Sequence, residues 1–185
     1  MLSSSPYRDV KVIDVARKAG TSPATFYQYF PDVEGAVLEI AEEMAKEGAT
    51  LTDLVAGRSW VGKSAWTAAE DLVEGFLSFW RKHDAILRVV DLGAAEGDKR
   101  FYKIRMKILN AVTNSLTDSI KDLQSKNKVD KDVSPAAIAG SMVAMLAAVA
   151  AHQKGFQSWG VKQAELKPNL ALLVHLGVTG KKPTK

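Results

Sequence analysis

The chain has 185 residues, of which 46% are apolar and 25% are charged, and this balance excludes a mainly disordered protein. No apolar run reaches the roughly 18 residues that span a bilayer and no secretion signal is evident, so we expect a cytoplasmic protein with no membrane partner. The lack of cysteine excludes disulfides, thiolate nucleophiles and the usual structural zinc sites, whereas a formal net charge of +4 suits a nucleic-acid partner.

The first predicted elements are two short helices separated by Gly20. Ser22 is a favoured N-cap, and it stands directly before Pro23, which is well tolerated at the first helical position. The second helix is therefore expected to begin at Pro23, which makes the pair a helix-turn-helix. The apolar residues that share one face of the first helix are Val12, Val15, Ala16 and Ala19.

The second short helix has one apolar side and one polar side. Phe26 and Phe30, four residues apart, are expected to pack against the first helix. Hydroxyl and amide groups on the other side suit a DNA groove, because they bond phosphate oxygens and base edges. A plain helical hairpin with surface tyrosines is the alternative. The predicted DNA-binding residues are Lys11, Ser22, Pro23, Ala24, Thr25, Tyr27, Gln28 and Tyr29.

The stretch AGTSPATFYQYFPD resembles the signature of TetR-type transcriptional regulators, in which a T-x-Y-x-[YH]-F run is followed by a charged turn and a long connecting helix. The continuation VEGAVLEIAEEMAKEG and the helical remainder also match the layout of that family. The resemblance implies an all-α fold, with a helix-turn-helix headpiece and a C-terminal helical domain that binds an effector and dimerises.

Two features depart from the family pattern, and the charge of the headpiece is a separate point against strong phosphate binding. Only MLSSSPYRD precedes Val10, so the first helix is expected to be missing, through a start further upstream, disorder or a natural truncation. The position that usually carries a phosphate-binding lysine is Val33. The headpiece is acidic as well, with five basic and eight acidic residues between Met1 and Gly48.

The connecting helix is expected to follow Asp32, and the domain boundary lies near Glu47. We therefore predict a DNA-binding headpiece over 1–47 and an effector-binding and dimerisation domain over 48–185. Gly48 to Lys63 is expected to be a connection with one helical turn at Leu51 to Val55. The apolar stripe of the connecting helix consists of Val37, Leu38, Ile40, Ala41 and Met44.

Three long helical patterns follow Ser64. The first is expected to end at Lys82 and His83, with a short separate piece over Asp84 to Leu92. The second keeps helical spacing from Phe101 to Leu123, and the third runs from the Ser134–Pro135 cap to about Trp159. A last apolar stretch covers residues 169–178.

The third pattern and the last apolar stretch are apolar on more than one side, so each must be covered on more than one side. In the family the last two helices pair with their mates in a four-helix bundle, and the pattern agrees with such a homodimer. An intramolecular core without a partner is the alternative.

Aromatic residues cluster in the middle of the chain, where the family has an effector cavity. Ordinary core packing is the competing interpretation for each residue. Because no charged partner is evident there, the expected effector is small and largely apolar. The predicted ligand-binding residues are Phe76, Trp80, Ile104, Ile108 and Met145.

No enzyme motif, cofactor motif or metal-ligand spacing is present, and the three histidines occupy separate predicted helices, so we expect no enzyme, no cofactor and no metal ion. The resulting hypothesis is a dimeric, ligand-responsive DNA-binding regulator, most simply a repressor on a palindromic operator. The alternative is a dimeric small-molecule-binding module that lost DNA binding through N-terminal truncation.

Overall fold

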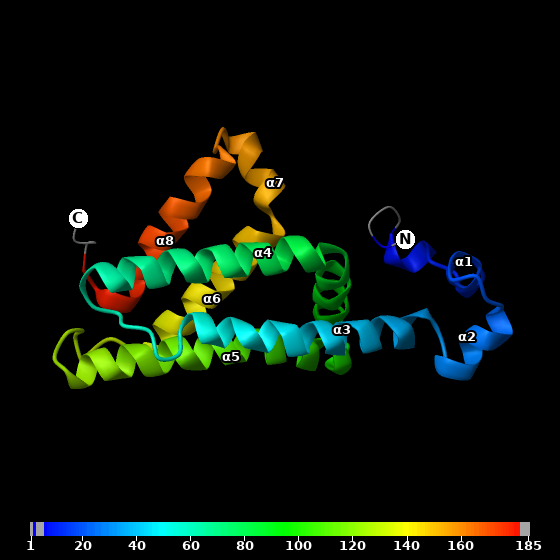
Figure 1. The fold of residues 1–185 in the computed structure, drawn as a ribbon, viewed down its shortest axis with the longest axis horizontal. Coiled ribbons are helices and arrows are strands. Elements are labelled where there is room, and N and C mark those ends of the chain that lie inside the picture. The colour runs from blue at the N-terminus through cyan, green and yellow to red at the C-terminus, as the bar shows by residue number, and fades with distance from the viewer. Residues whose placement is uncertain (1, 3–5, 182–185) are drawn as a thin grey trace. The chain divides into compact units, whose positions relative to one another are not determined.

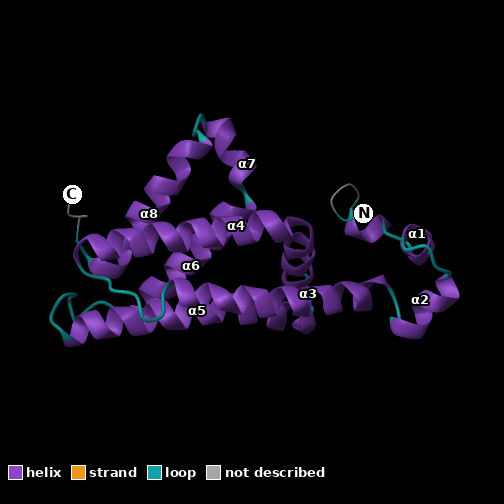
Figure 2. Ribbon diagram, in the orientation of Figure 1, coloured by secondary structure: helices purple, strands orange, loops and turns teal. Residues whose placement is uncertain are grey.

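The computed structural model describes residue 2 and residues 6–181, and within this part it contains helices, turns and loops but no strand (Figures 1 and 2). Residues 1, 3–5 and 182–185, which belong to the ends of the two predicted domains, lie outside the described residues. The all-α prediction is confirmed. In chain order the elements are the 3-10 helix η1 (Tyr7–Asp9), α1 (Val12–Lys18), α2 (Pro23–Tyr29), α3 (Val33–Ala49), the 3-10 helix η2 (Thr50–Leu54), α4 (Gly62–Ala95), α5 (Lys99–Ser125), α6 (Pro135–Ala151), α7 (Gln153–Phe156), the 3-10 helix η3 (Gln157–Trp159) and α8 (Gln163–Thr179).

The chain forms two compact units, and the first consists of Met1–Lys46 and His83–Met106. This unit contains α1, α2 and most of α3, together with the end of α4 and the start of α5. The last two segments pack closely, since a Cβ at Gly93 would lie 2.8 Å from Cγ of Phe101. Its buried apolar side chains include Ala16, Phe26, Val37, Ala41, Met44, Leu87, Val90, Phe101 and Ile104.

The second unit consists of Glu47–Lys82 and Lys107–Lys185. Its helices include α6 and α8, which pack so closely that a Cβ at Gly177 would lie 2.6 Å from Sδ of Met142. The division between the units falls inside α3, α4 and α5, so each of these helices contributes residues to both. The largest buried side chains of the second unit include Leu72, Val73, Phe76, Val112, Leu116, Ile120 and Leu146.

The predicted end of a helix at Lys82 and His83 is wrong. Helix α4 continues without a break to Ala95 and includes the segment that we expected to be a separate short piece. No proline interrupts the region, and Leu87, Val89 and Val90 continue a buried apolar side beyond the charged residues. Lysine and histidine are favourable at a helix C-terminus, but they do not themselves end a helix.

The predicted single helix from Pro135 to Trp159 is also wrong. Helix α6 ends at Ala151, and the next helical segment, Gln153–Trp159, is turned by 78°. At the bend, Nδ1 of His152 lies 2.8 Å from the carbonyl oxygen of Ala148, which also accepts the backbone N–H of His152 at 3.1 Å. Helix α8 begins at Gln163, upstream of the apolar stretch that indicated it.

Among the described residues no single helix is long and apolar enough to cross a membrane. The bent pair Pro135–Ala151 and Gln153–Trp159 meets the criteria of length and composition only when both helices are counted together.

Candidate nucleic-acid interface

The turn between α1 and α2 is built around Gly20. Its φ of +67° is in the left-handed region, which glycine adopts without a steric penalty. The amide of Thr21 donates to the carbonyl of Ala16 at 2.9 Å, and that of Gly20 donates to Arg17 at 3.2 Å. These bonds satisfy carbonyls at the end of α1 and turn the chain toward α2.

Ser22 caps the start of α2, as its sequence predicted. Its Oγ accepts the backbone N–H of Thr25 at 3.1 Å and lies 3.0 Å from the hydroxyl oxygen of the same residue. Pro23 occupies the first turn, where its missing N–H costs nothing. Because the cap fixes the first turn, it also fixes the directions of the exposed side chains that follow.

Phe26 and Phe30 hold the short helix in place. Phe26 is 7% exposed, its ring centroid lies 5.4 Å from that of Phe30, and Ala16 of α1 is fully buried in the same unit. The opposite side of α2 is open, since Tyr27 is 58% exposed and Tyr29 is 75% exposed. The helix therefore has one packed side and one side that can meet a partner.

All the predicted DNA-binding residues belong to the first unit, within a span that runs from the residue before α1 to the end of α2. Thr25 is half-buried and Lys11 is the exposed N-cap residue of α1. Val33 is half-buried at the start of α3 and provides no cation. The other members, Ser22, Pro23, Ala24, Tyr27, Gln28 and Tyr29, are exposed.

Two more cations lie beside this group. Lys18 is exposed at the end of α1 with no ion-pair partner in the described part of the chain, and Arg17 lies 3.5 Å from Asp14. In the sequence, a phosphate contact by Arg17 and Lys18 was indicated only by their position beside the motif. The exposed hydroxyls, amide and ammonium groups together can donate hydrogen bonds to phosphate oxygens.

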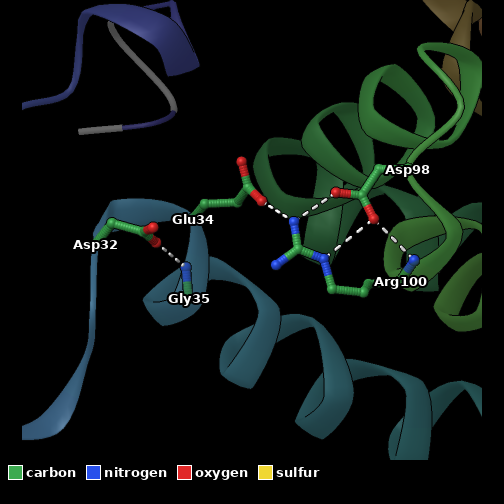
Figure 3. Close-up of polar contacts among 5 residues, drawn as sticks. All are labelled: Asp32, Glu34, Gly35, Asp98 and Arg100. Atoms are coloured by element: carbon green, nitrogen blue, oxygen red, sulfur yellow. Dashed lines mark hydrogen bonds and ion pairs between the residues drawn. The ribbon is translucent and has the colours of Figure 1, made fainter.

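A polar network that the sequence did not reveal lies at the start of α3, immediately after the helix-turn-helix (Figure 3). Asp32 caps α3 by accepting the backbone N–H of Gly35 at 2.7 Å. Arg100 forms ion pairs with Glu34 and with Asp98, the latter at 2.6 Å. These bonds join the first turns of α3 and α5 within one unit.

The network shifts the pKa values of its members. Hydrogen bonds from the side chain and then the backbone of Arg100 lower the pKa of Asp98 to about 2, and Asp98 in return raises the pKa of Arg100. Nearby, burial and then Glu34 and Asp32 raise the pKa of Tyr7. Asp98 therefore remains charged at neutral pH while Tyr7 remains neutral.

The predicted ligand-binding residues are mainly core positions. The rings of Phe76 and Trp80 are stacked, with centroids 4.6 Å apart and an interplanar angle of 11°, and both side chains are buried. Ile108 is buried in the same second unit and Met145 is half-buried there, whereas Ile104 belongs to the first unit. An effector that enters among these side chains has to displace them.

Helices α6 and α8 are drawn in yellow and in orange to red in Figure 1. Both helices have small or apolar side chains at their surface. Leu173 is 49% exposed, and Ala137, Ala144 and Ala148 are exposed along α6. Among the described residues no group of three or more His, Asp or Glu side chains is arranged to hold a metal ion.

The models of two protein families match the sequence. "Bacterial regulatory proteins, tetR family" matches residues 1–45, and "Tetracyclin repressor-like, C-terminal domain" matches residues 51–185. No curated protein is significantly similar to the chain.

Solved structures share the fold. A proposed TetR-family transcriptional regulator from Rhodococcus sp. has a TM-score of 0.65 and 14% identity, over 96% of this chain and 92% of that one. The fatty acid degradation regulator FadR from Bacillus halodurans has a TM-score of 0.69 and 14% identity, over 99% of this chain and 91% of that one.

Proposed function

Because the chain belongs to the TetR family of bacterial regulatory proteins, we propose that it is a cytoplasmic repressor that leaves a palindromic operator when a small, largely apolar effector binds. The observation that carries this proposal is the exposed side of α2, which is held by Phe26 and Phe30 and presents Tyr27, Gln28 and Tyr29. The headpiece would extend over residues 1–47 and the effector and dimerisation domain over 48–185. Its role is regulatory, without a catalytic step.

Two recognition helices of a dimer would enter successive major grooves, about 34 Å apart. Thr25, Tyr27 and Tyr29 would bond phosphates, and Gln28 can also read a base edge. Lys11 and Lys18 provide the local positive charge. Since the headpiece has few cations, we expect the affinity to depend less steeply on salt than in strongly basic DNA-binding domains.

The test of DNA binding is a gel shift with DNA adjacent to the gene and with duplexes that the protein selects from a random pool. The double variant Thr25→Ala with Tyr27→Ala should abolish the shift. Tyr102→Ala is a matched control, because Tyr102 is 53% exposed in the same unit but lies on α5. Equal binding by the double variant and the parent would refute the assignment of α2.

For the homodimer, we propose that the exposed sides of α6 and α8 face a second copy. Leu173→Glu should then give a monomer in analytical ultracentrifugation and weaken operator binding, because one headpiece would have to bind alone. Leu92→Glu is the control, since Leu92 is an exposed apolar residue of α4, at 41% exposure. A Leu173→Glu dimer of unchanged stability would exclude this face.

We propose that the effector contacts Phe76, Trp80, Ile108 and Met145, which all belong to the second unit, and that it changes the tilt of α3. An effector shifts the equilibrium only through its different affinities for the DNA-bound and released arrangements. Structures with and without an apolar inducer should therefore differ in the separation of the two Tyr27 residues of the dimer. A bound inducer with an unchanged separation would rule out this mechanism.

A second candidate function is a dimeric small-molecule-binding module without DNA affinity. The acidic headpiece and the uncharged Val33 favour it. Failure of the protein to select any duplex from the random pool, combined with dimerisation and binding of an apolar ligand, would establish this alternative.

A further inference from the structure

The second unit contains a small hollow between the segment before α4, the end of α5 with the turn that follows, and the end of α8. Its volume is about 200 Å³. A single water needs only about 10–15 Å³, whereas pockets for drug-sized molecules measure roughly 300–1,000 Å³. The hollow therefore fits a small organic molecule. Its lining includes Trp60, Val61, Leu123, Lys128, His175 and Lys181.

Two of the lining residues keep a buried polar atom without a partner. Trp60 is 4% exposed and His175 is 3% exposed, and neither Nε1 of Trp60 nor Nδ1 of His175 forms a hydrogen bond in the described part of the chain. Buried polar groups in folded proteins are nearly always paired, so two unpaired ones beside one hollow call for an explanation. A bound molecule with hydrogen-bonding oxygens would supply both partners.

The hollow also has a positive edge. Lys128 and Lys181 are exposed residues of its lining, and neither has an ion-pair partner among the described residues. No carboxylate belongs to the lining. The indole N–H is a donor and the imidazole nitrogen is a donor in one of its tautomers, so both groups can bond an oxygen anion.

We propose that this hollow binds a small carboxylate with an apolar body, such as an aromatic acid with a single ring. The carboxylate would accept hydrogen bonds from Nε1 of Trp60 and from His175, with Lys128 and Lys181 compensating its charge. Val61 and Leu123 would contact the apolar body. Because the two polar atoms are covered in the present arrangement, the lining side chains have to move when the ligand enters. The proposal is independent of DNA binding.

The test uses the full chain labelled with ¹⁵N-tryptophan, whose four indole N–H groups give separate NMR signals. Benzoate should shift the Trp60 signal, which Trp60→Phe identifies, in a saturable manner. Trp159 is an internal control, because it is 76% exposed in the same unit and does not line the hollow. The neutral analogue benzamide should bind at least tenfold more weakly, and inorganic phosphate should leave the signal unchanged.

Variants then test the charged edge. Lys128→Gln with Lys181→Gln should raise the dissociation constant of benzoate about tenfold without changing the rest of the spectrum. The control Lys121→Gln with Lys126→Gln removes the same charge from α5, where these lysines pair with Asp118 and Asp122, and should leave the affinity within twofold of the parent. The proposal is overturned if benzoate at millimolar concentration leaves the Trp60 signal in place, shifts all four signals equally, or binds both double variants alike.

Discussion

Arg100, in the first turn of α5, forms an ion pair with Glu34, in the first turn of α3 (Figure 3). Glu34 lies two residues after the cap residue Asp32, and Asp32 lies three residues after Tyr29, the last residue of α2. The pair therefore links the beginning of α3 to the beginning of α5 within their unit. A change at Arg100 acts close to α2 although it lies about seventy residues away in sequence.

We predict a small, salt-sensitive coupling between Arg100 and Glu34. Both side chains are partly exposed, at 59% and 38%, so solvent screens much of their attraction. In a double-mutant cycle with Glu34→Gln and Arg100→Gln, each single change should lower the melting temperature slightly, and the double change should lower it by less than their sum. The coupling should disappear in 1 M salt. Additive effects at low salt would show that the pair is not stabilising.

Asp98 should make the protein sensitive to acid. The hydrogen bonds from Arg100 lower its pKa in the folded protein to about 2, below the ordinary value of 3.8, so the unfolded chain binds the proton more readily. The stabilisation is complete above pH 4 and is lost as the pH falls toward 2. Asp98→Asn keeps a good helix cap but removes the charge. Urea unfolding should show a larger loss for this variant at pH 7 than at pH 2.5, and equal losses would contradict the prediction.

The sequence predicted the local parts of the interface well, because they depend on neighbouring residues. Gly20, Ser22 and Pro23 define a turn and a cap through backbone preferences, and the structure confirms both. The spacing of Phe26 and Phe30 also indicated which side of α2 is packed. Such signals act over four residues or fewer, so they can be read without the tertiary structure.

Contacts between residues distant in sequence could not be predicted from the sequence. The partners of Arg100 are set by how α3 and α5 pack, and nothing in the residues near Glu34 indicates a cation distant in sequence. The end of α4 was missed because favourable end residues are weaker than continued burial. The end of α6 was missed because neither Ala151 nor His152, where the chain bends, is a proline or a glycine. The predicted ligand positions show the same limit, since helical spacing does not distinguish a packed core from a cavity wall.

Ser22→Ala should impair DNA binding more than its effect on stability suggests. Loss of an N-cap costs about 1 kcal/mol. Because α2 has only seven residues, this loss should destabilise the whole helix that carries the proposed DNA contacts. Ser134→Ala is the matched control, because Ser134 caps α6 before a proline in the same manner. Calorimetry should show destabilisation in both variants, whereas fluorescence anisotropy should show weaker operator binding mainly for Ser22→Ala. Equal losses of affinity would show that global stability controls binding.

Gly48 lies where α3 approaches α4 and α5 within the second unit. A Cβ at this position would lie 3.0 Å from Cζ of Phe79 and 3.1 Å from Cγ2 of Ile108, which is closer than comfortable contact. For Gly48→Ala, the gain in helix propensity of up to about 1 kcal/mol should offset the tight contact, so the net change should be small.

Gly48→Val adds a Cβ and two methyl groups to the same crowded place, and overpacking of this kind costs about 1–3 kcal/mol. Gly155→Ala is the control for helix propensity, since nothing lies within 4 Å of a Cβ there. Urea unfolding measures the three stabilities. Because the valine presses on Ile108, it should also change the inducer concentration needed to release the operator, whereas the Gly155 variant should not. An unaltered inducer response in a destabilised Gly48→Val protein would remove Ile108 from the proposed effector site.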